Sequence, residues 1–226
     1  MARRTAKDFL EEMDLAFGGP SATIPKPAMK LRWLNTAYTL DIAGGYDHRE
    51  LTGSTTTATV SAQAYVDHTA TDILILQDPV DSTSGGPPIT EITQRYYDRL
   101  VQGAPTSDTG PPRHWYQRGV TTGKLPRCYF EPTPDAVYSL VWPYRKRPTL
   151  LVLSPFPTST VLPEEWDESL LNFAIAYGWG RMGDVKKMQA YKANAIAAGG
   201  AALRISGRLS GVHHSMGGFV HGVVNG

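Results

Sequence analysis

The chain has 226 residues, a formal net charge of +1 at pH 7 and 41% hydrophobic residues. This length allows one large domain or two small ones, and the near-neutral charge excludes a protein whose whole surface attracts nucleic acid. Cys128 is the only cysteine, which excludes an intramolecular disulfide and favours a small strand residue over a nucleophile. No apolar run reaches the roughly 20 residues of a membrane span, and the acidic segment after Arg3 and Arg4 is unlike a signal peptide.

The N-terminal part predicts two amphipathic helices, over 5–17 and 25–43. Thr5 precedes Asp8 by three residues, which resembles a capping box, and a Gly-Gly-Pro sequence ends the first helix. A proline opens the second helix and a glycine pair closes it. Its predicted buried stripe consists of Leu31, Leu34, Tyr38 and Ile42.

Residues 54–161 contain short β-branched or alternating segments separated by Pro, Gly and Asp clusters. This pattern predicts a small antiparallel β region with exposed loops at 81–88 and 103–112. The stretch "ITEITQRYYDRLV" is compatible with a strand followed by a short helix, a choice that its periodicity leaves open.

The segment "FEPTPDAVYSLVWPYRKRP" (130–148) alternates like a strand and ends in three cations. Pro132, Pro134 and Asp135 predict the turn of a hairpin. Pro143 predicts an edge strand or the end of regular pairing, because proline cannot donate to the ladder. The buried face of the hairpin is predicted to contain Tyr138, Leu140 and Trp142.

The pattern from Leu162 onward predicts two further helices. The first starts near Pro163 and carries Glu164, Glu165 and Asp167 in its first turn, where carboxylates favour the positive helix end. After Asp184, an Ala-rich face marks a second helix that permits close packing. The predicted buried stripe of the first helix consists of Trp166, Leu170, Phe173 and Tyr177.

Four helices therefore bracket the β region. The predicted fold is α+β, a helical bundle with an inserted small antiparallel β subdomain and an extended C-terminal tail. The predicted parts are N-terminal helices at 1–53, a β-rich insertion at 54–161, C-terminal helices at 162–198 and a Gly-rich basic tail at 199–226.

Catalytic motifs are missing from the sequence. It contains no GxSxG, HExxH, Rossmann or CxxC motif, and "GVTTGKL" departs from a phosphate loop in its glycine spacing and in the Leu after Lys. His213, His214 and His221 have no acid after Asp184 to complete a metal site. We therefore predict a protein that is not an enzyme, with no catalytic, metal-binding or cofactor-binding residues.

The C-terminal segment has an unusual charge pattern. Residues 185–226 contain five Lys or Arg, three His and no acid, and the part from Gly199 onward is too rich in glycine to fold alone. The tail is either a floppy end or a segment that orders against an acidic partner surface. On the second hypothesis the contact residues are Arg204, Ile205, Arg208, Leu209, His213, His214, Phe219 and Val220.

An ordered set of motifs resembles the head–tail adaptor (connector) proteins of tailed bacteriophages. The motifs are "KLRWLNTAYTLDIAGG", "ITEITQRYYDRLVQGAPTSDTGPPRHWYQRG", "YFEPTPDAVYSLVWPYRKRPTLL" and "LPEEWDESLLNFAIAYGWGRMGD", and they span roughly 30–184. The resemblance implies a structural virion protein that forms a ring, commonly of twelve copies, between the portal and the tail, through which double-stranded DNA passes without sequence readout. It also implies synthesis in the host cytoplasm, a place in the virion neck, and as partners the portal and a tail, nozzle or tail-terminator protein. The C-terminal tail would dock onto the portal, and neither a cofactor nor a membrane is expected.

Within such a ring, the basic triplet at 145–147 is predicted to lie at the rim of a subunit boundary, and a solvated strand end is the alternative. The candidate subunit-interface residues are Tyr144, Arg145, Lys146, Arg147, Trp115 and Tyr116.

Two other functions stay open. A carbohydrate- or receptor-binding β module of a phage tail would use exposed aromatic residues, although helices on both sides are superfluous for such a module. A nucleic-acid-binding protein would use the triplet at 145–147 and the tail, although the near-neutral charge disfavours it. The aromatic candidates for the first alternative are Tyr96, Tyr97, Trp115, Tyr116 and Trp142.

Overall fold

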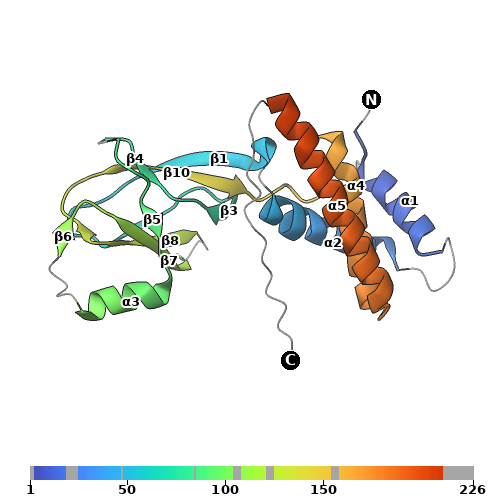
Figure 1. The fold of residues 1–226 in the computed structure, drawn as a ribbon, viewed down its shortest axis with the longest axis horizontal. Helices are drawn as coiled ribbons and strands as arrows, with labels where there is room; N and C mark the ends of the chain where they lie inside the picture. Colours follow the sequence, from blue (N-terminus) through green and yellow to red (C-terminus); the bar gives the residue numbers. More distant parts are fainter. Residues whose placement is uncertain are drawn as a thin grey trace. The chain divides into compact units, whose positions relative to one another are not determined.

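The protein is a mixed α+β protein that divides into two compact units (Figure 1). Unit 1 consists of Met1–Ile42 and Leu150–Gly226, and unit 2 of Ala43–Thr149. None of the described helices is long and apolar enough to cross a membrane. The computed structural model describes residues 3–18, 25–46, 48–83, 85–103, 108–120, 125–153 and 158–210.

The return of the chain to unit 1 is fixed by one side chain. Asn35 donates from Nδ2 to the Leu151 carbonyl over 3.0 Å, and its Oδ1 accepts the Leu151 N–H over 2.7 Å. Both backbone groups of the buried Leu151 are thus satisfied by one amide. Unit 1 resumes at Leu150, and unit 2 spans Ala43–Thr149. The sequence predicts the β insertion over 54–161, so both of its predicted bounds lie later in the chain.

Unit 1 is helical. Its first helix begins with a capping box, in which the Thr5 N–H donates to Asp8 over 2.7 Å and the Asp8 N–H donates to Thr5 Oγ1. The predicted pairing of Thr5 and Asp8 is therefore confirmed. The elements are α1 (Ala6–Ala16), α2 (Pro27–Thr36), the π-helix η1 (Ala37–Ala43), the 3-10 helix η3 (Glu164–Trp166), α4 (Asp167–Arg181) and α5 (Val185–Ser210).

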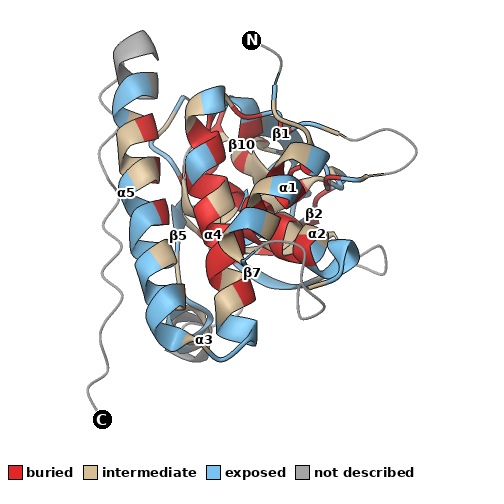
Figure 2. Ribbon diagram, turned by 90° about the vertical axis from the view of Figure 1, so that its right-hand side faces the viewer, coloured by how far each residue is buried: buried red, intermediate tan, exposed pale blue. Residues whose placement is uncertain are grey.

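Helix α4 is the centre of this unit and packs against α1, α2 and α5. Figure 2 shows it buried over most of its surface, whereas α5 is exposed along one side. Gly178 lets α4 approach the rings of Phe17 and Trp33, which meet edge-to-face with their centroids 5.9 Å apart. A helix that is buried almost all round explains why its apolar residues do not form one narrow stripe.

Helix α5 lies against α4 through small residues. Ala195 and Ala202 are fully buried, and Ser169 Oγ donates to the Ala195 carbonyl over 2.9 Å. The helix continues to Ser210, so the extended tail predicted from Gly199 onward is wrong for 199–210. Gly199 and Gly200 each cost the helix about 1 kcal/mol of stability relative to alanine. The alanines on both sides of this pair and the burial of Ala202 offset that cost.

The described residues of unit 2 form two four-stranded sheets, a two-stranded sheet, one α-helix and one 3-10 helix (Figure 1). One sheet has the order β1-β10-β3 with β4 also paired to β10, the second has the order β2-β8-β7-β5, and the third pairs β6 with β9. The elements are η2 (Arg49–Leu51), β1 (Thr52–Ala58), β2 (Tyr65–Asp67), β3 (Ile73–Leu76), β4 (Val80–Asp81), β5 (Thr90–Glu91), α3 (Gln94–Gly103), β6 (Thr109–Gly110), β7 (His114–Val120), β8 (Pro126–Glu131), β9 (Thr133–Pro134) and β10 (Ser139–Lys146).

The predicted α+β class is confirmed, but the β region is not purely antiparallel as predicted. Strand β5 pairs with β7 in parallel, with Thr90 opposite His114, and β6 pairs with β9 in parallel. Parallel neighbours need a crossover connection, and α3 supplies it between β5 and β7. The stretch whose periodicity left the choice open is therefore a short strand followed by a helix.

The predicted hairpin at 130–148 does not form. Strand β8 pairs with β2 and β7, whereas β10 pairs with β1, β3 and β4 in another sheet. At Pro143 the sequence predicts an edge strand or the end of regular pairing. The edge is wrong, because β10 has neighbours on both sides, whereas the pairing on the side of β3 and β4 is interrupted there. The Pro143 carbonyl accepts the Gln77 N–H over 2.9 Å. The Pro143 nitrogen, which carries no hydrogen, therefore lies on the side of β10 where the pairing changes from β3 to β4, and no ladder bond is lost there.

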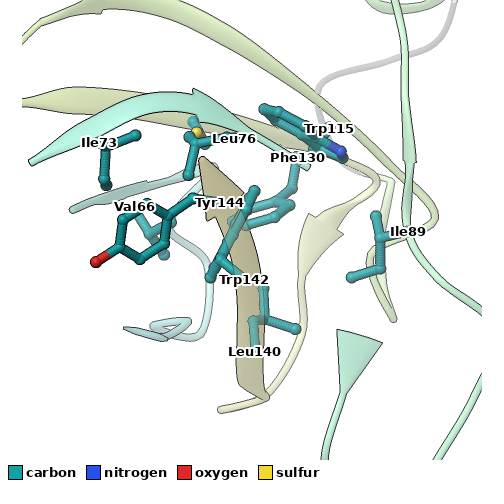
Figure 3. Close-up of a cluster of buried hydrophobic side chains, with 10 residues drawn as sticks. Val66, Ile73, Leu76, Ile89, Trp115, Phe130, Leu140, Trp142 and Tyr144 are labelled. Atoms are coloured by element: carbon teal, nitrogen blue, oxygen red, sulfur yellow. The ribbon is translucent and has the colours of Figure 1, made fainter. Parts of the chain in front are cut away.

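The core of unit 2 is built around Trp142 (Figure 3). Its ring centroid lies 5.0 Å from that of Trp115 in an edge-to-face arrangement, and its Nε1 donates to Thr57 Oγ1 over 2.7 Å. Trp142 is fully buried, and Leu140 beside it on the same strand is also 0% exposed. The predicted apolar face is therefore in the core of the unit at Leu140 and Trp142, whereas Tyr138 is only partly buried against it.

Candidate interaction surface

The thiol of Cys128 is buried inside unit 2. Cys128 Sγ lies 3.5 Å from His68 Nε2, and both residues are buried beside the ring of Trp142. Burial raises the pKa of the Cys128 thiol far above its usual range and lowers the pKa of His68 to about 4. Both groups are neutral at pH 7, so this pair lacks the thiolate that a nucleophile requires.

Three of the candidate subunit-interface aromatics lie in the chain's own core. Trp115 and Tyr116 are each 1% exposed, and Tyr144 is 7% exposed. Tyr116 packs against Tyr97 of α3, and the Tyr144 hydroxyl bonds Asp72 over 3.1 Å. Their side chains therefore pack within unit 2 of the single chain, and their contact with another subunit stays a prediction.

The basic triplet after them is not a continuous charged patch. Arg145 Nη1 donates to the Gly44 carbonyl over 2.6 Å. Lys146 is half-buried, and its Cε would lie 2.7 Å from a side chain added at Gly53. Arg147 alone of the three is exposed.

The predicted bundle-core residues are mostly buried in unit 1. Leu31 and Tyr177 are half-buried. Tyr177 bonds Asp41 of η1, and burial followed by this bond raises the pKa of Tyr177 to about 12. The buried members are Leu34, Tyr38, Ile42, Trp166, Leu170 and Phe173.

The described part of the predicted portal-binding segment belongs to α5. Arg204 is exposed and Ile205 is 48% exposed, so both are available to a partner. Arg208 and Leu209 lie in the last turns of the helix. The remaining members, His213, His214, Phe219 and Val220, lie outside the described residues.

A cleft of about 610 Å³ opens beside this part of α5, between it and the start of α4. One wall is acidic and the other is built from small or aliphatic side chains, so the described tail residues adjoin negative charge. The residues that line the cleft are Arg4, Glu164, Glu165, Asp167, Glu168, Ala198, Ala201, Ala202 and Ile205. Sequence reasoning attributed the carboxylates to the helix end alone and missed the cleft, because nothing local indicated that α5 packs beside them.

Asp167 is the most unusual group of this cleft. It is 5% exposed, and no hydrogen bond or ion pair joins its carboxylate to another of the residues that the structure describes. Burial, with the nearby charges of Glu164 and Glu12, raises the pKa of Asp167 to about 6, against the attraction of Arg4 and Arg3. The positive helix end would lower this pKa, so desolvation outweighs it here.

We expect an Asp167→Asn substitution to stabilise the protein at pH 8 and to leave it nearly unchanged at pH 4. The pKa of Asp167 in the folded state, about 6, lies above its unfolded-state value of about 3.8. The folded protein therefore loses stability as the pH rises from about 4 to 6, because the buried carboxyl group must ionise. At pH 8 the gain in the free energy of unfolding is at most about 3 kcal/mol. Urea unfolding at both pH values measures it, and Glu168→Gln, which neutralises an exposed neighbour, is the control. An equal change at both pH values would contradict the assignment.

The search for a metal site and the comparisons with known proteins gave the following results. In the described part of the chain, no group of three or more His, Cys, Asp or Glu residues is placed to hold a metal ion. No curated protein matches the chain. The family model described as SU10 adaptor protein matches residues 4–214, nearly the whole chain. The chain therefore belongs to the SU10 adaptor protein family, and the resemblance to phage adaptors drawn from its sequence is confirmed.

Proposed function

We propose that this phage adaptor protein assembles into a ring, with twelve copies as the expected number, between the portal and the tail, so that DNA passes through its centre. The observation that carries the proposal is the family match over residues 4–214. An adaptor of this kind is structural rather than catalytic, and its place would be the virion neck.

The exposed apolar surface of unit 1 supports this proposal. A ring subunit must offer two different faces, one to each neighbour. Single exposed apolar residues are ordinary, but several large ones on separate helices suit a chain that is covered on more than one side. These residues are Leu15 at 78% exposure, Leu40 at 60%, Val185 at 54%, Ile196 at 53% and Ile205 at 48%.

The C-terminal part of the chain is the proposed contact with the portal. Arg204 and Ile205 are exposed on α5, and the segment that follows carries no acid. The partner on the other side would be a tail, nozzle or tail-terminator protein. The alternative of a glycan-binding module is weakened, because Trp115, Tyr116 and Trp142 are buried and cannot stack on a sugar, which leaves Tyr96 as the one exposed member of its aromatic set.

The experiment is electron microscopy of the purified protein, alone and mixed with the portal protein of its phage, with native mass spectrometry for the number of copies. We expect closed rings that attach to the portal. A chain lacking 211–226 should still form rings but lose portal attachment. A protein that stays monomeric at high concentration and ignores the portal would overturn the proposal.

A further inference from the structure

The cleft between η3–α4 and α5 has an unbalanced charge. Four carboxylates line it, at Glu164, Glu165, Asp167 and Glu168, and the lining contains one cation, Arg4. Arg4 is already joined to Glu12 through an ion pair of 3.2 Å. Even with Glu165 left aside, Glu164, Asp167 and Glu168 give the cleft a net negative charge that is larger than the half charge of a helix end can offset.

The burial of Asp167 points to a missing positive partner. A carboxylate that is 5% exposed and makes no hydrogen bond to the other described residues is costly, and native proteins normally pair such a group. The same carboxylate lines the cleft, so a cation that entered the cleft would meet it directly. Three further acids around the buried Asp167 carboxylate select a cationic occupant.

The opposite wall shows what kind of cation fits. It consists of Ala198, Ala201, Ala202 and Ile205, so one side of the cleft is apolar while the other is acidic. A bare metal ion makes no favourable contact with an aliphatic wall. A Lys or Arg side chain has an aliphatic stem for that wall and a charged end for the carboxylates.

The chain itself carries such cations on the outer face of α5, defined here by Lys186, Ala190, Ala193, Ala197 and Arg204. All five residues are exposed. Lys186 and Arg204 are 18 residues apart, which is five helical turns, so they lie on one side of the helix at the two ends of a face of small residues. No acid occurs in α5 or after it.

Lys186 cannot enter the cleft of its own chain. The cleft-lining part of α5 begins at Ala198, about 18 Å further along the helix axis, which is beyond the reach of a lysine side chain. Two complementary surfaces on different parts of one chain are what a head-to-tail ring contact requires. We propose that the acidic cleft of one copy binds cationic side chains from the outer face of α5 in a second copy. This inference rests on the proposed ring and names one of its contacts.

A charge exchange tests the inference, with the molar mass of the full-length protein measured by light scattering at low and high salt. Glu164→Lys with Glu168→Lys, and separately Lys186→Glu with Arg204→Glu, should each weaken assembly at least tenfold. The variant with all four substitutions should regain assembly, because the charges are exchanged and not removed. Glu11→Lys, an exposed reversal on α1, is the control, and circular dichroism checks that each variant folds.

The outcomes separate the inference from the ring itself. Assembly that withstands either pair of substitutions, or that the fourfold variant does not regain, overturns the inference while the ring stands. If Glu164→Lys with Glu168→Lys leaves the rings intact and abolishes only portal attachment, the portal occupies the cleft, and this also overturns the inference. A wild-type protein that forms no ring overturns the proposed function together with the contact.

Discussion

Replacing Gly178 with alanine is expected to destabilise unit 1 by about 1–3 kcal/mol. A Cβ at this position would lie 2.3 Å from Cζ of Phe17 and 2.9 Å from Cζ3 of Trp33, closer than real side chains approach. Helix propensity predicts the opposite sign, since alanine in a helix interior gains up to about 1 kcal/mol over glycine. The sign of the change therefore reports whether the rings of α1 and α2 pack on α4 as the structure shows.

Gly180→Ala is the matched control on the same helix. There the added carbon would lie 2.9 Å from Sδ of Met188, the end of a flexible side chain that can swing aside. We expect a neutral to slightly stabilising change. Denaturant unfolding, together with hydrogen exchange of peptides from α1 and α4, measures both variants. A Gly178→Ala protein as stable as the Gly180→Ala protein would show that Phe17 does not occupy this position.

The helices of unit 1 could be predicted because their signals are local. The capping box at Thr5 and the start of the helical region near Pro163 depend on residues three or four positions apart, and the structure contains both. The end of α5 could not be predicted in this way. A glycine pair reads as the end of a helix, and the packing of Ala202 that carries the helix beyond it depends on a contact with another helix.

The strands of unit 2 could be predicted, but their partners could not. Alternation places Leu140 and Trp142 on one face, and the core of the unit is on that face. Pairing is set by residues far apart in the sequence, so a Pro-Pro-Asp cluster reads as a hairpin turn although β8 and β10 belong to different sheets. The place of Pro143 in a central strand depends on a break between β3 and β4 that no local pattern contains.

The candidate site shows the same division. Each carboxylate at the start of α4 has a local explanation in the helix end. Only the packing of α5 beside them turns these acids into one wall of a cleft and buries Asp167. The outer face of α5 could be read from helical spacing alone, whereas the surface that it would complement depends on tertiary structure.

Replacing Trp142 with alanine is expected to cost unit 2 about 3–5 kcal/mol, the other large effect. The indole touches Trp115, Phe130 and His68, and its removal would leave a large cavity and an unpaired Thr57 hydroxyl. Trp142→Phe keeps a ring but loses the bond to Thr57, so its cost should be intermediate. Urea unfolding and hydrogen exchange of peptides from β1 and β10 measure the series.

The control is Val137→Ala, a substitution in the same segment at a side chain that is 66% exposed. Its effect should stay within about 0.5 kcal/mol.

The series also separates the two interpretations of the aromatic strip at 130–148. If the strip were a ligand platform, Trp142→Ala would remove binding and leave unfolding unchanged. If Trp142 holds two sheets together from inside, stability falls and any loss of assembly follows from unfolding of unit 2. Its 0% exposure requires the second result.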